Sequence, residues 1–384
     1  MGSGVDCPVT FAYPEREHQS LRGPIEQAVL DVLRSGRYIL GPSVQRFEQA
    51  LCGYVGARHA VAVSSGTDAL VCSLLALNVG QGDEVIVPAF GFVAGAEAVV
   101  RVGARPVFVD IEPRTLGPEP AAVQSSVTSR TKAIVVMHLF GQAVDVEPLQ
   151  RAAPGVVLIE DAAQAIGTHV QEAHVASRAT LATLSFFPAK SLGAAGDAGA
   201  VLTNDASMDR RLRVCRVHGA ASPYRWDHVG GNYRMDALQA AILTGKLEAL
   251  PARLERRRQM GGELRALVSR FGVQVFDGCD GCEPTFSPFV IRLLPRDQLR
   301  DGLRKSGIDA RVQYPITIVS SPCFSSYARV VHDACAGASF VHAVQATEQL
   351  LSIPCSPEFR LDEWKHLLGT VRELLEQCAE PTTK

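Results

Sequence analysis

The chain has 384 residues, of which 38 are basic and 40 are acidic, so its formal net charge is −2. A chain of this length can bury a large core and predicts more than one domain. The balanced charge excludes the basic surface that nucleic-acid binding requires. No apolar run approaches the roughly 20 residues of a membrane-spanning helix, and residues 1–18 lack the basic-then-apolar order of a secretion signal. We therefore expect a cytoplasmic protein that has neither nucleic acid nor membrane as a partner.

Ten cysteines are scattered along the chain, and several of them lie in apolar helical patterns. We interpret them as reduced, mostly buried thiols, which agrees with a cytoplasmic location. Cys279 and Cys282 form a single CxxC pair in a loop-like stretch. Because no second pair accompanies it, we predict no metal site.

Apolar strand patterns alternate with helical patterns through the first two-thirds of the chain. The predicted strands are residues 59–65, 83–89, 105–111, 132–139 and 155–161, and the predicted helices are residues 67–77, 92–103 and 146–153. Residues 181–187 and 199–204 should extend the same sheet. Apolar strands that alternate with helices indicate an α/β fold, with a mostly parallel sheet covered by helices on both faces.

The last third of the chain has a different pattern. A strong helical pattern covers residues 235–250, and we expect Pro251 to end that helix. A second, polar helix should follow, with the arginines at 253, 256, 257 and 258 facing solvent rather than clamping a diphosphate. Residues 284–294 and 310–316 are predicted strands, and residues 296–308 and 361–377 are predicted helices. We therefore predict a large domain of residues 1–250 and a smaller C-terminal α+β domain of residues 251–384.

Two short strings point to chemistry. Lys190 lies in a loop of small residues (SFFPAKSLGAAGDAG), and Asp161 ends the apolar run VVLIED. A lysine amine can hold the aldehyde of pyridoxal 5'-phosphate (PLP) as a Schiff base and then exchange it for a substrate amine. A carboxylate at the C-terminal end of a strand can keep the pyridine nitrogen protonated. The pair predicts PLP as the cofactor, with pyridoxamine 5'-phosphate forming during turnover.

A phosphate site is suggested by the string VAVSSGTDAL, which places small and hydroxyl residues between a strand and a helix. Backbone amides at a helix N-terminus bind anions, and Gly66 would allow a close approach of the backbone. Thr67 adds a hydroxyl group. An ordinary helix cap would leave the same pattern, so this string alone does not decide between the two readings.

Together, the strings SFFPAKSLGAAGDAGAVLTND, EDAAQAIGT, SSGTDAL and HLFGQAVDVEPL resemble the DegT-like sugar aminotransferases, a branch of the fold-type I PLP enzymes. The resemblance runs from about Ile39 to the LSIPCSPEF segment. It implies a fold-type I PLP transferase with Lys190 and Asp161 as catalytic residues. It also implies a homodimer with shared active sites.

The resemblance assigns further residues to the cofactor. It implies that Gly66, Thr67 and Ser185 bind the phosphate. It implies that Asn232, in HVGGNYRMD, reaches the phosphate from the partner subunit. Two residues should frame the ring: Phe92 stacked on its face, with Phe90 as a rival, and Gln164 against the ring and its hydroxyl.

The substrate side of the site departs from the family pattern. Tyr314 follows Gln313 where the family usually has His-Tyr-Pro. An amide cannot carry the charge or proton of an imidazole, so any role of that histidine is in doubt here. Arg234 could bind a carboxylate or a diphosphate, and an ion pair with Asp236 or another neighbour explains it equally well.

We therefore expect an aminotransferase that moves an amino group from an amino acid, with L-glutamate as the expected donor, to a keto-sugar that is nucleotide-linked. A cyclitol ketone is an alternative acceptor. A PLP-dependent sugar dehydratase on this fold would resemble the family branch that has histidine at the position of Lys190. A non-catalytic, ligand-sensing regulator is the remaining alternative.

Overall fold

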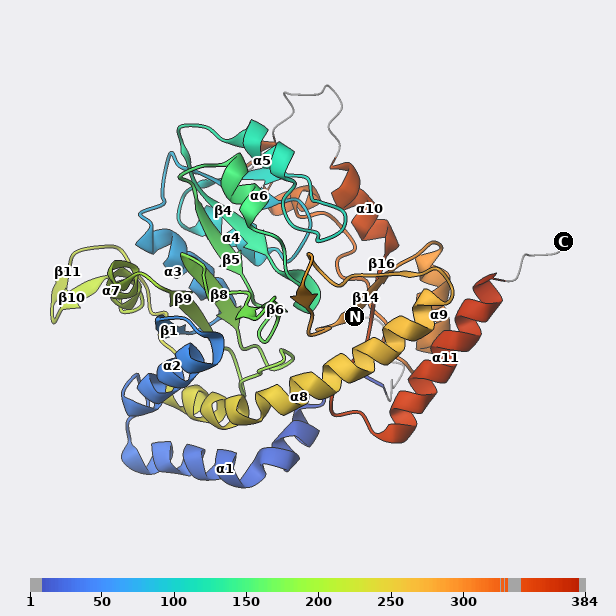
Figure 1. The fold of residues 1–384 in the computed structure, drawn as a ribbon. Coiled ribbons are helices and arrows are strands. Elements are labelled where there is room, and N and C mark those ends of the chain that lie inside the picture. The colour runs from blue at the N-terminus through green and yellow to red at the C-terminus, as the bar shows by residue number, and fades with distance from the viewer. Residues whose placement is uncertain (1–8, 325, 328, 331–339, 380–384) are drawn as a thin grey trace.

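A large, mostly parallel sheet forms the centre of the molecule in the computed structural model, which describes residues 9–324, 326–327, 329–330 and 340–379 (Figure 1). Its eight described strands follow the order β1-β9-β8-β5-β4-β2-β3-β15. Only the β1–β9 and β8–β9 pairs are antiparallel. The bounds are β1 His59–Val63, β2 Glu84–Pro88, β3 Arg105–Val109, β4 Thr131–Met137, β5 Val157–Asp161, β8 Leu181–Ser185, β9 Gly199–Thr203 and β15 Arg329–Val330. The strands predicted for this sheet are confirmed.

Helices cover both faces of this sheet, because successive residues of each strand point to opposite sides. Val85 and Val87 of β2 pack in the cluster that contains α3 and α4, whereas Ile86 packs in the cluster beneath α5 and α6. The covering helices are α2 Pro42–Val55, α3 Gly66–Ala76, α4 Ala94–Arg101, α5 Pro120–Ser126, α6 Glu147–Ala152 and α7 Ala206–Cys215.

One long helix, α8 (Ala237–Ser269), runs along the molecule, and α1 (Pro14–Ser35) lies beside it (Figure 1). The prediction that Pro251 ends the helix is wrong, because α8 continues through it. Leu250 and Leu254 are both buried on either side of the proline, so packing offsets the lost backbone hydrogen bond. The proposed domain boundary at residues 250 and 251 falls inside this helix.

The C-terminal part has its own three-stranded sheet, β12 (Gln274–Val275), β14 (Phe289–Arg292) and β16 (Leu350–Ile353). Helices α9 (Arg296–Lys305) and α11 (Leu361–Ala379) pack beside it, as predicted. The strand predicted at residues 310–316 is wrong, since only Arg311 forms a bridge, to Ser352. Val9 and Tyr13 pack into the core of this unit, so the division at residue 250 stays a prediction.

Short elements complete the described chain: η1 Leu139–Gly141, β6 His169–Val170, β7 Ala173–His174, β10 Ala220–Ser222, β11 Arg225–Trp226, β13 Cys282–Glu283, η2 Ile318–Ser320, η3 Pro322–Phe324 and α10 Val341–Gln349. Among the residues described, no helix is long and apolar enough to span a membrane. Cys7 and Cys335 lie outside the described residues, as do residues 1–8 of the segment in which we expect no secretion signal.

His174 makes stability depend on pH. Its ring is buried, with its two nitrogens 2.9 and 3.2 Å from the amides of Gly167 and Ala176, and burial lowers its pKa from 6.5 to about 3. Below about pH 6.5 the unfolded chain binds a proton at His174, whereas the folded protein leaves this ring neutral. The free energy of unfolding therefore falls as the pH decreases. Relative to His174→Gln, the wild type should lose about 2 kcal/mol of unfolding free energy between pH 7 and pH 5. Denaturant unfolding of both proteins at each pH would measure this, and parallel pH curves would contradict it.

Candidate active site

A cavity of about 510 Å³ opens where β4, β5 and β8 end, and both Lys190 and Asp161 line it. Parallel strands bring their carboxyl ends to the same edge of a sheet, which is where α/β proteins bind ligands. Residue 161 pairs with Met137 of β4 and with Thr183 of β8. The sheet thus fixes the carboxylate, and the loop between β8 and β9 brings the lysine to the same space.

Asp161 is a buried carboxylate with two hydrogen-bond donors. Its Oδ1 accepts from the Ala163 amide at 3.1 Å and from the Thr183 hydroxyl at 3.3 Å. Burial raises the pKa of Asp161, while these donors and the charge of Lys190 act in the opposite direction. A cation placed against this carboxylate would favour its ionised form.

Lys190 is held by a turn in which its amide donates to the Phe187 carbonyl at 2.8 Å. Burial lowers the pKa of its amine, and the nearby Asp161 carboxylate offsets part of that effect. A lower pKa increases the fraction of neutral amine, which is the nucleophilic form. The pair predicted from the sequence is thus brought together in one cavity.

Gly66, Thr67 and Ser185 also line the cavity. Gly66 begins α3, and the Ser65 hydroxyl accepts from the Asp68 amide at 3.0 Å, so the first-turn amides of residues 66 and 67 have no partner within the helix. A Cβ on Gly66 would lie 2.7 Å from the Ser185 Cβ. Only a glycine permits this close approach of helix and strand, and the result is a cradle with the chemistry of an anion site.

Aromatic rings gather around Tyr314, which lines the cavity. Phe92 is 51% exposed and lies 6.2 Å from the Tyr314 ring, whereas Phe90 is fully buried. The Phe140 ring stacks on Tyr314 at 6.4 Å. Of the two phenylalanines that compete for the predicted ring contact, only Phe92 lines the cavity.

Gln164 and Gln313 also line the cavity, with different hydrogen bonding. Gln164 accepts from the Phe140 amide at 2.8 Å and donates to the Tyr314 hydroxyl at 3.0 Å. It therefore fixes the tyrosine, whose pKa burial raises to about 12. The Gln313 Oε1 is buried and has no hydrogen-bond partner among the described residues.

Two of the predicted site residues do not line this cavity. Asn232 is exposed and forms a backbone bridge with Val217. Arg234 forms a bridge with Val63, and its Nε is buried without a hydrogen-bond partner. The ion pair considered for Arg234 is absent from the described part of the chain.

The structure adds residues that the sequence reasoning missed. His138 lines the cavity, accepts from the Val144 amide at 3.1 Å and lies 3.0 Å from Glu160. Its place at the end of a predicted strand was the available signal. The expectation that the α8 arginines face solvent is wrong for Arg253 and Arg257, because Arg253 pairs with carboxylates and Arg257 is 7% exposed.

The cavity fits PLP in each of its chemical parts. The cradle at Gly66, Thr67 and Ser185 suits the phosphate, the Asp161 carboxylate suits a protonated ring nitrogen, and the Lys190 amine suits the aldehyde. Phe92 offers an exposed ring face in the same cavity.

The Gly66 cradle can be tested by adding one methyl group. Gly66→Ala should weaken PLP retention at least tenfold, because the new Cβ would meet Ser185 and push the strand end away from the helix. Gly53→Ala, in a helix with open space at the Cβ position, is the matched control and should retain PLP normally. Equilibrium dialysis of both variants measures the effect. Equal retention would show that the cradle does not need glycine.

The comparisons with known proteins cover almost the whole chain. Residues 19–372 match the model of the DegT/DnrJ/EryC1/StrS aminotransferase family. A protein of Geobacillus stearothermophilus named a pleiotropic regulatory protein is 38% identical over 94% of this chain and 97% of its own length. A UDP-N-acetyl-3-dehydro-alpha-D-glucosamine 3-aminotransferase of Acidithiobacillus ferrooxidans is 37% identical over 92% of this chain and 95% of its own length.

Solved structures give the same result. The crystal structure of S. venezuelae DesV in complex with a ketimine intermediate has a TM-score of 0.90 and 34% identity, and the match covers 96% of this chain and 98% of DesV. The predicted fold class, the aminotransferase activity and the PLP cofactor are thereby confirmed. The chain belongs to the DegT/DnrJ/EryC1/StrS aminotransferase family.

Proposed function

We propose that the protein moves the amino group of an amino acid, L-glutamate in the first instance, to the keto group of a nucleotide-linked sugar. The single observation that supports this most is the cavity shared by Lys190, Asp161 and the Gly66 cradle. The relative that acts on a UDP-linked amino sugar supports the acceptor class. The product would be a nucleotide-linked amino sugar.

PLP, when bound, supplies an electron sink and stores the amino group between the two half-reactions. The protein's own part begins with the Lys190 Nζ. We propose that this amine, whose pKa is lowered by burial, moves the proton at the substrate carbon that carries nitrogen. The Asp161 carboxylate, whose Oδ1 is oriented by Ala163 and Thr183, would hold the ring nitrogen of a bound cofactor in its protonated form.

We propose that Gln313 and Tyr314 bind substrate, as predicted. The Gln313 Oε1 is buried, lacks a partner among the described residues and lines the cavity, so a hydroxyl or amine of the substrate could satisfy it. Tyr314 lines the same cavity, and Gln164 orients its hydroxyl. Arg234 remains a proposed ligand for an anionic group, since no ion pair occupies it in the described structure.

We also propose a homodimer with shared active sites, in which Asn232 reaches the partner's cofactor. Asn232 is exposed and does not line its own cavity. Large apolar side chains lie exposed nearby, including Trp226 at 62% and Val229 at 86%. The β10–β11 hairpin that carries Trp226 projects from the molecule beside α7 (Figure 1). A second copy of the chain would cover these side chains. We propose that the dimer works in the cytoplasm, where the free cysteines would stay reduced.

The other proposals of function have less support. The name of the Geobacillus relative favours a regulator, but a ligand sensor would not need both a catalytic lysine and its carboxylate partner. A dehydratase of the histidine type is disfavoured because residue 190 is lysine. A cyclitol acceptor would use the same residues and differs only in the substrate.

The amino-transfer proposal predicts that the PLP-loaded protein forms 2-oxoglutarate from L-glutamate when a nucleotide keto-sugar is present. Lys190→Ala should lower turnover at least 10³-fold, because the amine that moves the proton is lost. Lys365→Ala is a control at an exposed lysine of α11. Assays with UDP- and dTDP-linked keto-sugars and with a cyclitol ketone identify the acceptor. Near-normal turnover by Lys190→Ala would refute the mechanism.

Shared active sites predict complementation between two inactive variants. Asn232→Ala should lose PLP affinity and activity, and mixing it with Lys190→Ala under subunit exchange should restore about a quarter of wild-type activity. The gain arises because each mixed dimer has one intact site. Mixtures that stay at the activity of the separate variants, with exchange confirmed by differently tagged chains, would show that each site is built from one subunit.

A further inference from the structure

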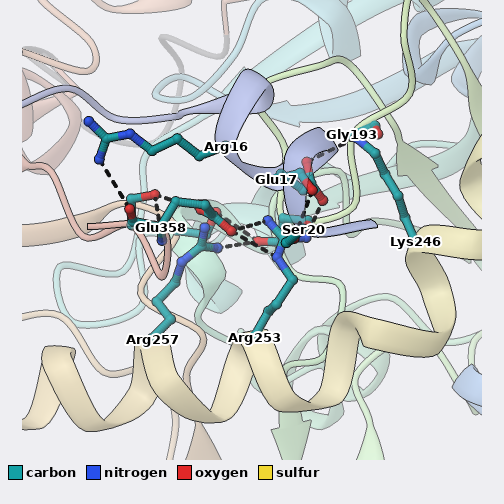
Figure 2. Close-up of polar contacts among 11 residues, drawn as sticks. Arg16, Glu17, Ser20, Gly193, Lys246, Arg253, Arg257 and Glu358 are labelled. Carbon is teal, nitrogen blue, oxygen red and sulfur yellow. Dashed lines mark hydrogen bonds and ion pairs between the residues drawn. The ribbon is translucent and has the colours of Figure 1, made fainter. Parts of the chain in front are cut away.

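Three cations of α8 point toward the loop that follows Lys190. Lys246 donates to the Gly193 carbonyl at 2.8 Å and pairs with Glu17 at 2.9 Å. Arg253 pairs with Glu17 and, at 2.7 Å, with Glu358. Figure 2 shows their side chains, with that of Arg257, rising from α8 toward the same side. Two of the three cations are thus neutralised by carboxylates.

Arg257 is the exception in this group. Its guanidinium donates to the Ser191 hydroxyl at 2.6 Å, and its Nε has no hydrogen-bond partner. It forms no ion pair with any carboxylate in the described part of the chain. The nearby Glu17 and Glu358 are both engaged by Arg253. The side chain is only 7% exposed, so water cannot fully solvate the charge.

An unpaired buried charge is costly, and proteins retain one where a ligand completes it. Arg257 lines the cavity that holds Lys190 and Asp161. Its bonded partner, Ser191, is the residue next to Lys190. An anion that binds Arg257 in this cavity would therefore share the cavity with the Lys190 amine. The planar guanidinium suits a carboxylate, which it can bind through two parallel hydrogen bonds.

We infer that Arg257 binds the α-carboxylate of the amino donor. This inference rests on the proposed amino transfer, because the donor's amine must reach the position that Lys190 occupies. The carboxylate nearest to that amine is the one on the same carbon. The keto carbon of a sugar ring carries no carboxylate, so Arg257 acts in the donor half-reaction. Since every α-amino acid carries this carboxylate, Arg257 sets the orientation of the donor and not its side-chain identity.

A purely structural role, in which Arg257 only anchors the loop through Ser191, makes a different prediction. Such a role depends on the hydrogen bond to the Ser191 hydroxyl, and Ser191→Ala would remove it while keeping the guanidinium. Ser191 also donates to the Ser287 hydroxyl at 3.1 Å, and the loop is held separately by Lys246 at Gly193. Ser191→Ala therefore tests the hydrogen bond that anchors the loop, whereas Arg257→Gln also removes the positive charge.

The test compares wild type, Arg257→Gln, Arg257→Lys and Ser191→Ala, all as PLP-loaded protein. Calorimetry with glutarate, a dicarboxylate that has no amine to transfer, measures carboxylate binding without turnover. Single-turnover kinetics measure the donor half-reaction with L-glutamate and the acceptor half-reaction separately. Thermal unfolding verifies that each variant is folded.

We expect Arg257→Gln to weaken glutarate binding and lower kcat/KM for L-glutamate at least tenfold. The acceptor half-reaction and the affinity for uridine diphosphate should stay at wild-type values. Arg257→Lys should recover part of the loss, and Ser191→Ala should bind glutarate as the wild type does.

Equal glutarate affinity in wild type and Arg257→Gln would overturn the inference, as would equal damage by Ser191→Ala and Arg257→Gln. A loss of uridine diphosphate affinity in Arg257→Gln would instead assign the arginine to a diphosphate. If wild type binds glutarate through Arg257 but transfers no amine from any amino acid, the proposed function fails while the carboxylate site stands.

Discussion

The side chains of Lys190 and Asp161, which carry opposite charges when ionised, line one cavity. Burial raises the pKa of the carboxyl group and lowers that of the amine, and each charge offsets part of the effect on the other. These opposing effects on the two pKa values persist only if the distance between the two side chains is fixed. The sheet fixes Asp161 by pairing residue 161 with strands on both sides. The lysine lies in a loop and needs other supports.

Those supports come from distant parts of the chain. Lys246 and Arg253 of α8 donate to carbonyl groups at Gly193 and Ser191, just after Lys190. Glu17 of α1 binds both cations and so fastens the N-terminal helix to the same point (Figure 2). A buried set of ion pairs thus connects the loop to α8 and α1. We regard it as a positioning device more than a source of stability, because desolvation consumes much of the Coulomb gain.

Close packing of the backbone shapes the part of the cavity that Gly66 lines. Like Gly66, residue 199 at the start of β9 must be a glycine, because a Cβ there would lie 2.4 Å from the Ser65 carbonyl. The helix N-terminus, β8 and β9 therefore approach one another more closely than side chains would allow. The consequence is that free amides, the Thr67 and Ser185 side chains and Lys190 all open on one cavity.

The sequence by itself determined the strands of the large sheet and the predicted fold class, and it predicted Lys190 and Asp161 as the catalytic pair, because apolar periodicity and short motifs are local signals. It predicted Gly66, Thr67, Ser185, Gln164, Phe92 and Tyr314, all of which line the cavity. It failed at Pro251, at the strand predicted for residues 310–316 and at the α8 arginines. Only the tertiary structure decided those points, since burial and pairing depend on groups far away in the chain: Glu17 and Arg253 are 236 positions apart. A helical pattern shows which residues share a face, but it does not show which distant carboxylates will neutralise them, nor that Arg257 will be left without one.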